Sequence, residues 1–304
     1  MDLYLLGAGF SSDAGVPTMK KFFGAVKQTQ LAFTDTPLHD TLTRAIHYAE
    51  ESGTENIEDL LVSAINQPVF SDLIWTFGLT INQCSRKFLT ACQSSADVGW
   101  YEKLAKIIAA SGAHVLTFNY DLILEDTLWW RAGFVEDYFI SFSENHHRPC
   151  PVSNHATVPV YKLHGSISWL WCLRCSYTIN RYRHILATAY QNTPCPRCNM
   201  PLIPLIIPPT FHKAFDLALT LDKIWQQADL LFAQATRIIV GGLSFAERDA
   251  DFRNRFIAGV QQNRHLEEVV IVNRDEKRCA VIGQLLPKGT PWRSVSGFPQ
   301  YCNE

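Results

Sequence analysis

The sequence predicts an α/β fold with a parallel, doubly wound sheet, and three observations support the prediction. Apolar runs of strand length alternate with segments of helical period, the first run leads into a Gly-x-Gly turn, and polar residues follow several of the runs. The 304 residues are 47% hydrophobic, which suits one large or two modest domains with a sizeable core. A helical insertion and a small zinc-binding module are expected to interrupt the sheet.

The first expected element is a strand that begins at Asp2 and runs into the turn Gly7-Ala-Gly9. Two glycines let the backbone turn sharply and approach a ligand closely, and the helix start behind them offers free N–H groups to anionic oxygens. The turn therefore predicts a dinucleotide phosphate site. The same pattern can also serve only to pack a helix on a sheet.

A helical insertion is expected next, because residues 20–92 show no strand pattern. Apolar residues recur at helical spacing from Ile57 to Ile65, and Asn56-Ile-Glu-Asp59 has the form of a helix cap with acids in the first turn.

Strands and helices then alternate to the end of the chain, as in a series of βα units. Expected strands are 114–118, 160–163, 205–207, 237–242 and 269–273, and expected helices are 101–110, 121–131, 221–235, 247–262 and 275–286. We interpret 1–304 as one domain, with a Rossmann-like core at 1–19, 96–168 and 204–304, the helical insertion at 20–95 and a zinc ribbon at 169–203.

Polar residues follow two of the expected strands. Asn119 and Asp121 come after one strand, and His164 comes after another. In a parallel sheet these side chains would converge above the glycine turn, where His can accept a proton near neutral pH and Asn can orient a water or a ribose hydroxyl. The alternatives are that Asn119 and Asp121 only cap a helix and that His164 is a satisfied core residue.

Four of the nine cysteines form the pairs Cys172-x-x-Cys175 and Cys195-x-x-Cys198. This spacing is typical of a zinc ribbon with four thiolates, which leaves the metal no open position and so a structural role. A redox pair or chance spacing is the alternative.

Composition and charge exclude several classes of function. The formal net charge of −2 leaves no basic stripe, so nucleic acid is not an indicated partner. No apolar run reaches the roughly 18 residues that cross a bilayer. Since the first strand begins at Asp2, we expect no cleaved signal and a cytoplasmic location.

Four elements in a fixed order resemble the sirtuin family, from the first strand to the last. They are Gly7-Ala-Gly-Phe-Ser-Ser-Asp-Ala-Gly-Val-Pro17, Thr117-Phe-Asn-Tyr-Asp121, Lys162-Leu-His-Gly-Ser166, and the late pair Gly242-Leu-Ser-Phe245 with Val272-Asn273. The resemblance implies an NAD-binding fold with a structural zinc.

The resemblance also implies a role for each matching residue. Asn119 and Asp121 would lie by the nicotinamide ribose, and His164 would be the general base or the partner of a ribose hydroxyl. The residues implied to hold NAD are Gly7, Ala8, Gly9, Ser11, Ala14, Pro17, Gly242, Ser244 and Asn273.

Departures from the family bear on the reaction. Protein-deacylating sirtuins usually continue after the proline with Asp-Phe-Arg, where this chain has Thr18-Met-Lys-Lys21. They usually carry Phe-Gly-Glu after the zinc module, as part of the acyl-lysine channel, where this chain has Leu205-Ile-Ile-Pro-Pro-Thr210. Both features resemble divergent bacterial sirtuin-like proteins of antiphage defence, which hydrolyse NAD to nicotinamide and ADP-ribose.

The sequence therefore favours an NAD hydrolase. The alternatives are an NAD-dependent protein-lysine deacylase and a non-catalytic subunit that binds NAD or ADP-ribose. Because an unrestrained NAD hydrolase would be toxic, we expect either a homo-oligomer or a regulatory partner protein.

Overall fold

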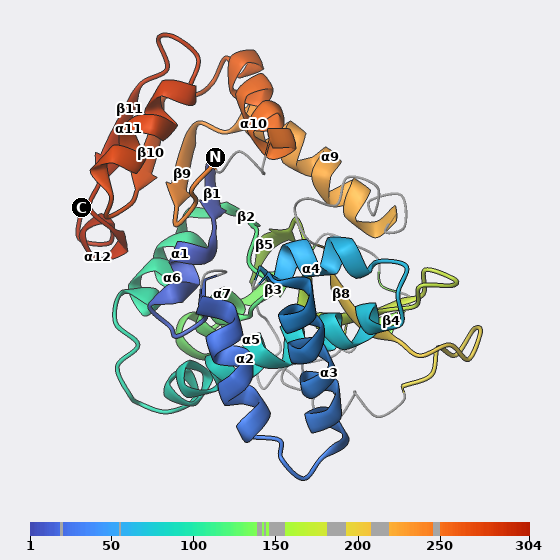
Figure 1. Cartoon of the computed structure of the whole chain (residues 1–304). Helices are drawn as coiled ribbons and strands as arrows, with labels where there is room; N and C mark the ends of the chain where they lie inside the picture. Colours follow the sequence, from blue (N-terminus) through green and yellow to red (C-terminus); the bar gives the residue numbers. More distant parts are fainter. Residues whose placement is uncertain are drawn as a thin grey trace.

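The computed structural model describes residues 1–18, 21–54, 56–138, 142, 144–145, 156–180, 193–207, 219–245 and 250–304. Its centre is a seven-stranded parallel sheet in the order β11-β10-β9-β1-β2-β5-β3 (Figure 1). These strands are β1 (Asp2–Leu6), β2 (His114–Thr117), β3 (Val135–Asp137), β5 (Thr157–Lys162), β9 (Arg237–Gly241), β10 (Glu268–Val272) and β11 (Trp292–Val295).

The central strands are apolar runs that are covered on both faces. In β1, β9 and β10 every residue after the first is buried, as expected of a parallel sheet between two helical layers. β1 pairs with β2 on one side and with β9 on the other. The chain thus builds the sheet outward in two directions from β1, and the boundary between β1 and β9 is the topological switch point, where such sheets bind ligands.

The helices of the core connect or flank these strands. They are α1 (Ala8–Ser12), α6 (Trp100–Ser111), α7 (Ile123–Thr127) with a π-helical turn at Leu128–Ala132, α9 (Leu219–Gln234), α10 (Ala250–Gln262), α11 (Glu276–Leu285) and α12 (Phe298–Tyr301). Crossovers between parallel strands are right-handed, so α6, between β1 and β2, and α10, between β9 and β10, lie on opposite faces of the sheet.

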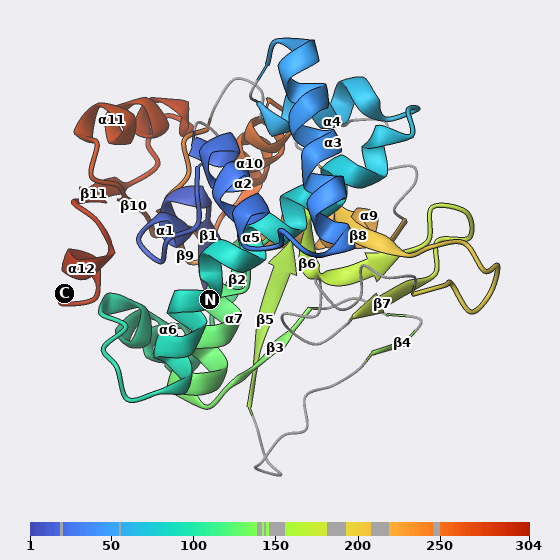
Figure 2. The same ribbon diagram turned by 60° about the horizontal axis from the view of Figure 1, so that its bottom comes forward.

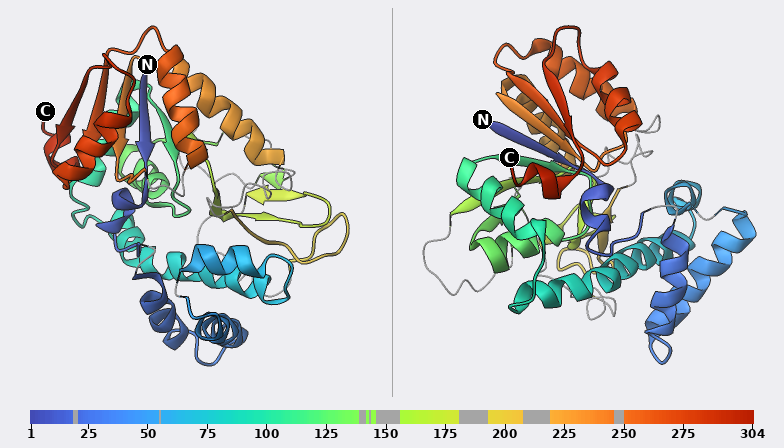
Figure 3. Two further views of the ribbon diagram at one scale, coloured as in Figure 1. Left: turned by 45° about the horizontal axis from the view of Figure 1, so that its top comes forward. Right: turned by 90° about the vertical axis from the view of Figure 1, so that its left-hand side faces the viewer.

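The region after α1 is helical, as predicted. It contains α2 (Phe22–Leu31), α3 (Pro37–Ser52), α4 (Ile57–Ala64) and the long α5 (Val69–Gln93). The cap predicted at Asn56 is confirmed, because its side chain accepts a hydrogen bond from the Glu58 amide at 3.0 Å. Helices α2 and α3 lie to one side of the sheet, and α5 leads back to it (Figure 3).

A second, four-stranded sheet has the order β4-β7-β6-β8, with β4 (Glu144–Asn145), β6 (Gly165–Trp171), β7 (Thr178–Asn180) and β8 (Ile203–Ile206). It continues from the end of β5 (Figure 2). The strand expected at 205–207 forms as β8. From the sequence we expect it in the parallel sheet, but in the structure it belongs to the second sheet. The reason is its antiparallel pairing with β6, which buries all four β8 residues.

Among the described residues no helix is both long and apolar enough to cross a membrane.

Candidate functional site

The turns after β1 and β9 are packed directly against each other at the switch point. The amide of Gly7 donates to the carbonyl of Gly241 at 3.0 Å, and the amide of Gly9 donates to that of Gly242 at 2.9 Å. Gly242 has φ +68, and a Cβ on it would lie 2.3 Å from the amide nitrogen of Phe10. Contact between the two turns therefore accounts for the glycines, and two amides that we expected to face a phosphate are used inside the protein.

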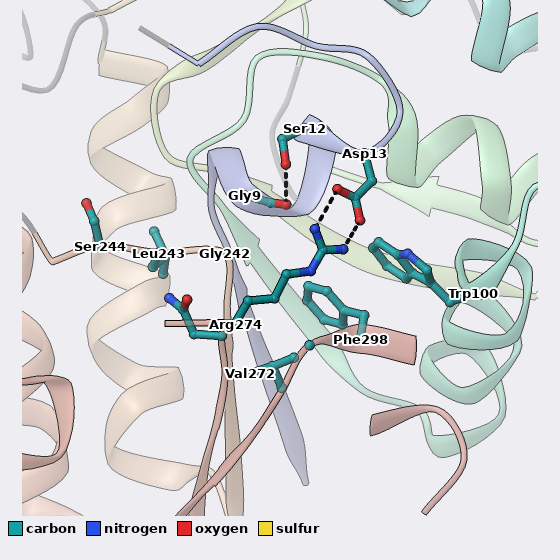
Figure 4. A pocket seen from close by; sticks show the side chains of 12 residues that line it. Gly9, Ser12, Asp13, Trp100, Gly242, Leu243, Ser244, Val272, Arg274 and Phe298 are labelled. Atoms are coloured by element: carbon teal, nitrogen blue, oxygen red, sulfur yellow. Dashed lines mark hydrogen bonds and ion pairs between the residues drawn. The ribbon is translucent and has the colours of Figure 1, made fainter. Parts of the chain in front are cut away.

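A pocket of about 230 Å³ opens beside this contact, at the carboxyl ends of β9, β10 and β11. It is lined by Gly9, Ser12, Asp13, Trp100, Gly242, Leu243, Ser244, Val272, Asn273, Arg274, Gly297 and Phe298 (Figure 4). Four of the residues predicted to hold NAD are among them, namely Gly9, Gly242, Ser244 and Asn273. The other five, Gly7, Ala8, Ser11, Ala14 and Pro17, are not in the lining.

Several lining residues were not predicted. Trp100 and Phe298 begin two helices and stack face to face, with ring centroids 4.7 Å apart and planes 10° apart. Asp13 and Arg274 form an ion pair across the pocket. Arg274 directly follows Asn273, so its position after an expected strand is the only feature of the sequence that could have indicated a pocket residue. No local sequence pattern indicates that Trp100 and Phe298 line the pocket.

Asn119 is held by hydrogen bonds at the end of β2. Its Nδ2 donates to the Gly7 carbonyl and to Ser11 Oγ, each at 2.9 Å. Both amide hydrogens are thus used inside the protein, and Oδ1 is left to accept a hydrogen bond from a ligand or water. Ser11 also acts to lower the pKa of Asp121, so Asn119, Ser11 and Asp121 belong to one buried polar group.

Asp121 has two functions in the fold. Its Oδ1 accepts a hydrogen bond from the first amide of α7, that of Ile123, at 3.0 Å, and so satisfies a donor at the start of this helix, as the alternative interpretation expected. Burial raises the pKa of Asp121, while nearby Lys162 and the Ile123 amide act against that increase. The same carboxylate therefore caps a helix and places a buried acid beside Asn119.

Lys162 is a buried cation that was not predicted as a site residue. It is 1% exposed, and its Nζ donates to the Asp121 carbonyl at 2.7 Å and to Glu125 Oε1 at 2.8 Å. Tyr138 donates to the same carboxylate oxygen at 3.2 Å. A lysine at the end of an apolar strand was the available signal. Because a buried charge is costly without partners, this network fixes the ends of β2 and β5 relative to each other.

His164 lies at the end of β5, with 3% of its surface exposed. Thr117 pairs with Lys162 in the sheet, so the strand ends that carry Asn119 and His164 are neighbours. Burial lowers the pKa of His164 to about 4, which leaves the imidazole neutral at physiological pH. A neutral imidazole is the form that accepts a proton.

Tyr120 indicates which nitrogen of His164 is basic. The Tyr120 hydroxyl donates to the Ile207 carbonyl at 2.9 Å, so an oxygen lone pair faces His164 Nδ1 at 3.4 Å. This arrangement favours the tautomer with a proton on Nδ1 and leaves Nε2 as the acceptor.

The backbone around His164 is fixed by β8. The Ile207 amide donates to the His164 carbonyl at 3.0 Å. Gly165 has φ +88, and a Cβ on it would lie 2.0 Å from the Leu205 carbonyl oxygen, so only glycine permits this approach. Phe118 and Trp225 cover the ring, with centroids 5.3 and 6.1 Å away.

The four predicted cysteines form one cluster. Their sulfur atoms all lie within 4.8 Å of one another, and the closest pairs are Cys172 with Cys198 at 3.3 Å and Cys175 with Cys195 at 3.4 Å. Four thiolates at Zn–S distances of about 2.3 Å in a tetrahedron are about 3.8 Å apart, so the cluster fits a structural zinc ion.

The two halves of this cluster have the same local fold. The amide of Ser176 donates to the Cys172 carbonyl at 3.0 Å, and the amide of Asn199 donates to that of Cys195 at 2.8 Å. Ser176 and Asn199 both have a left-handed backbone, with φ of 54 and 60. The repeated turn points both cysteines of each pair at one centre.

The family description "SIR2-like domain" matches residues 113–281, which is more than half of the chain. The chain belongs to the SIR2-like family. The matched residues of this SIR2-like protein run from β2 to α11 and include Asn119, Asp121, His164 and the four cysteines. The sirtuin resemblance seen in the sequence is therefore confirmed at the level of the family.

Two solved structures show the same fold. A sirtuin from a study of substrate affinity is 15% identical, covers 100% of this chain and 91% of its own, and has a TM-score of 0.50. A Sir2 protein bound to an acetylated peptide is 15% identical, covers 100% and 90%, and has a TM-score of 0.52. No curated protein matches the chain.

Proposed function

We propose that this SIR2-like protein consumes NAD and that its reaction is hydrolysis to nicotinamide and ADP-ribose. One observation supports this most strongly. An open pocket and a buried group of Asn119, Asp121 and a neutral His164 lie at the same edge of the sheet, on the two sides of the switch point. A dinucleotide that spans the switch point would place one nucleotide in the pocket and the other beside the buried group.

The reaction would break the bond between the nicotinamide nitrogen and C1 of the ribose. The electron pair leaves with nicotinamide through an oxocarbenium-like transition state, and water adds to C1. Nε2 of His164 would take the proton that the water or a ribose hydroxyl loses, and Oδ1 of Asn119 would orient that hydroxyl. The buried carboxylate of Asp121 would stabilise the electron-poor sugar.

The sequence of the segment after the zinc module supports hydrolysis over deacylation, because residues 205–210 depart from the Phe-Gly-Glu motif that protein-deacylating sirtuins usually carry. Ile207 of this segment is bonded through its backbone to His164 and Tyr120. Pro208-Pro-Thr210, and Met19 and Lys20 of the first departure, lie outside the described residues. Deacylation remains the second candidate, because one solved neighbour with this fold holds an acetylated peptide.

Three further expectations belong to this proposal. We place the enzyme in the cytoplasm and assign it to bacterial antiphage defence, where depletion of NAD would stop infection. We also expect a homo-oligomer or a partner protein to restrain it. A subunit that binds NAD or ADP-ribose without catalysis is the third candidate.

Product analysis tests the proposal. NAD is incubated with the full chain, with and without an acetyl-lysine peptide, beside the His164→Ala variant, and products are identified by mass spectrometry. Nicotinamide and ADP-ribose without peptide support hydrolysis, whereas O-acetyl-ADP-ribose only with peptide would establish a deacylase. Binding of ADP-ribose without turnover in any tube would instead favour the binding subunit.

A further inference from the structure

We propose that Arg274 recognises the phosphates of a nucleoside diphosphate in the pocket, and that Asp13 holds its guanidinium until the ligand arrives. The inference rests on the proposed function and adds to it a residue that controls affinity. Arg274 lies in the pocket on one side of the switch point, whereas the proposed base His164 lies on the other side.

The ion pair spans the pocket between two elements that are distant in sequence. Arg274 follows β10 and Asp13 follows α1, and the guanidinium meets the carboxylate through two nitrogens, with Nη1 donating to Oδ1 at 3.2 Å and Nη2 donating to Oδ2. Figure 4 shows the arginine side chain extended across the pocket, with Trp100 and Phe298 beside it. The aliphatic part of the Arg274 side chain packs beside Gly297, because a Cβ added to Gly297 would lie 3.5 Å from Arg274 Cγ.

The pocket needs a cation if it is to hold phosphates. The amides of Gly7 and Gly9 are already bonded to the turn after β9, so this turn supplies less positive charge than its sequence suggests. Among the described residues that line the pocket, Arg274 carries the one cationic side chain. Without it, Asp13 would give this lining a net negative charge that repels an anion.

Arginine can exchange one partner for the other without changing its geometry. Guanidinium binds carboxylates and phosphates through the same planar pair of donors. The Arg274 side chain is 65% exposed and that of Asp13 is 29% exposed, so the pair is held in solvent and is weak. A diphosphate, which carries more charge than a carboxylate, can therefore displace Asp13.

Calorimetry with ADP and with adenosine distinguishes the contribution of the phosphates to the binding affinity from that of the nucleoside. Arg274→Gln should weaken ADP binding about tenfold and adenosine binding less than twofold. Asp13→Asn should strengthen ADP binding about threefold, because the guanidinium is released from an exposed pair. In the double variant the gain from Asp13→Asn should disappear.

A matched control is the pair of Arg44 with Asp72 in the helical insertion. This ion pair is also bidentate, because Arg44 Nε donates to Asp72 Oδ2 at 2.7 Å and Nη2 donates to Oδ1 at 2.8 Å, and the Arg44 side chain is 54% exposed. Arg44→Gln should leave ADP binding unchanged. Melting temperatures of all variants establish that each is folded.

The outcomes distinguish the two proposals. If ADP binds but Arg274→Gln changes nothing, or if Asp13→Asn weakens binding, the role of the ion pair is wrong and the proposed function stands. If the wild-type protein binds neither ADP nor adenosine, the pocket is not a nucleotide site and both proposals fail.

Discussion

The two halves of the sheet's carboxyl edge differ in exposure and in what holds them together. On the side of β9, β10 and β11 the pocket is open, and its charged residues Asp13 and Arg274 are in solvent. On the side of β2 and β5, Asn119, Asp121 and His164 are each no more than 8% exposed and are fixed by hydrogen bonds. In the proposed function the open half binds the nucleotide and the buried half carries out the chemistry, with the contact of the two glycine turns between them.

The largest expected effect tests this division directly. His164→Ala should lower kcat for NAD cleavage by about 10³-fold, because it removes the proposed base, and should change ADP affinity less than twofold. Ser244→Ala, in the pocket, should raise KM about threefold and leave kcat nearly unchanged. Steady-state kinetics of nicotinamide release, with calorimetry for ADP, would measure both.

The same experiment can break the comparison. Near-normal turnover by folded His164→Ala would show that the assignment of the base is wrong. A fall in kcat for Ser244→Ala as large as that for His164→Ala would show that the two halves act as one site.

The contact between the halves should be sensitive to a single methyl group. Gly242→Ala would place a Cβ 2.3 Å from the Phe10 amide nitrogen at a residue with φ +68, so we expect a loss of about 3 kcal/mol in the free energy of unfolding. Gly112 has a similar φ of +62 but nothing within 4 Å of its Cβ position, so Gly112→Ala should cost only about 1 kcal/mol. Chemical denaturation measures the difference, and equal losses would refute the steric explanation.

The sequence predicted what depends on local pattern or on the ends of strands. The zinc cluster follows from two Cys-x-x-Cys turns, each of which is complete within a few residues. Asn119 and His164 could be placed because parallel strands bring their carboxyl ends to one edge. The resemblance to sirtuins, and not this rule, indicated Gly242, Ser244 and Asn273, which line the pocket.

What the sequence did not predict depends on pairing between distant segments. Asp13 and Arg274 are 261 residues apart, and the sequence around each does not indicate which oppositely charged residue it pairs with. Residues 203–206 have the apolar pattern of any buried strand, so only the structure shows that they pair with β6. That pairing places Ile207 on His164.

Removal of zinc should affect one half more than the other. β6 and β8 connect the cysteine cluster to Gly165 and Ile207, which hold His164, whereas the pocket residues come from other strands. Chelation, or Cys195→Ser, should therefore lower kcat at least about tenfold and change ADP affinity less than twofold. Zinc content by atomic absorption accompanies the kinetics, and a zinc-free protein with full activity would contradict this link.

The smallest expected effect concerns the tautomer of His164. Tyr120→Phe removes the oxygen that faces Nδ1, so part of the imidazole should move its proton to Nε2, and kcat should fall about threefold with ADP affinity unchanged. Nitrogen NMR of labelled histidine would detect the change of tautomer, which a merely structural role of Tyr120 would not produce.

In the wild-type protein burial keeps the pKa of His164 near 4, so the proposed base stays neutral and active as the pH falls from 7 to 5 and is lost only near 4. Unfolded chains take up this proton near pH 6.5. Stability should therefore decline between pH 6.5 and 4, before the base itself is protonated in the folded protein. An acid limb of kcat centred near 6.5 would show instead that His164 is exposed to solvent during turnover, and the contrast between a buried half and an open half would then hold only for the resting enzyme.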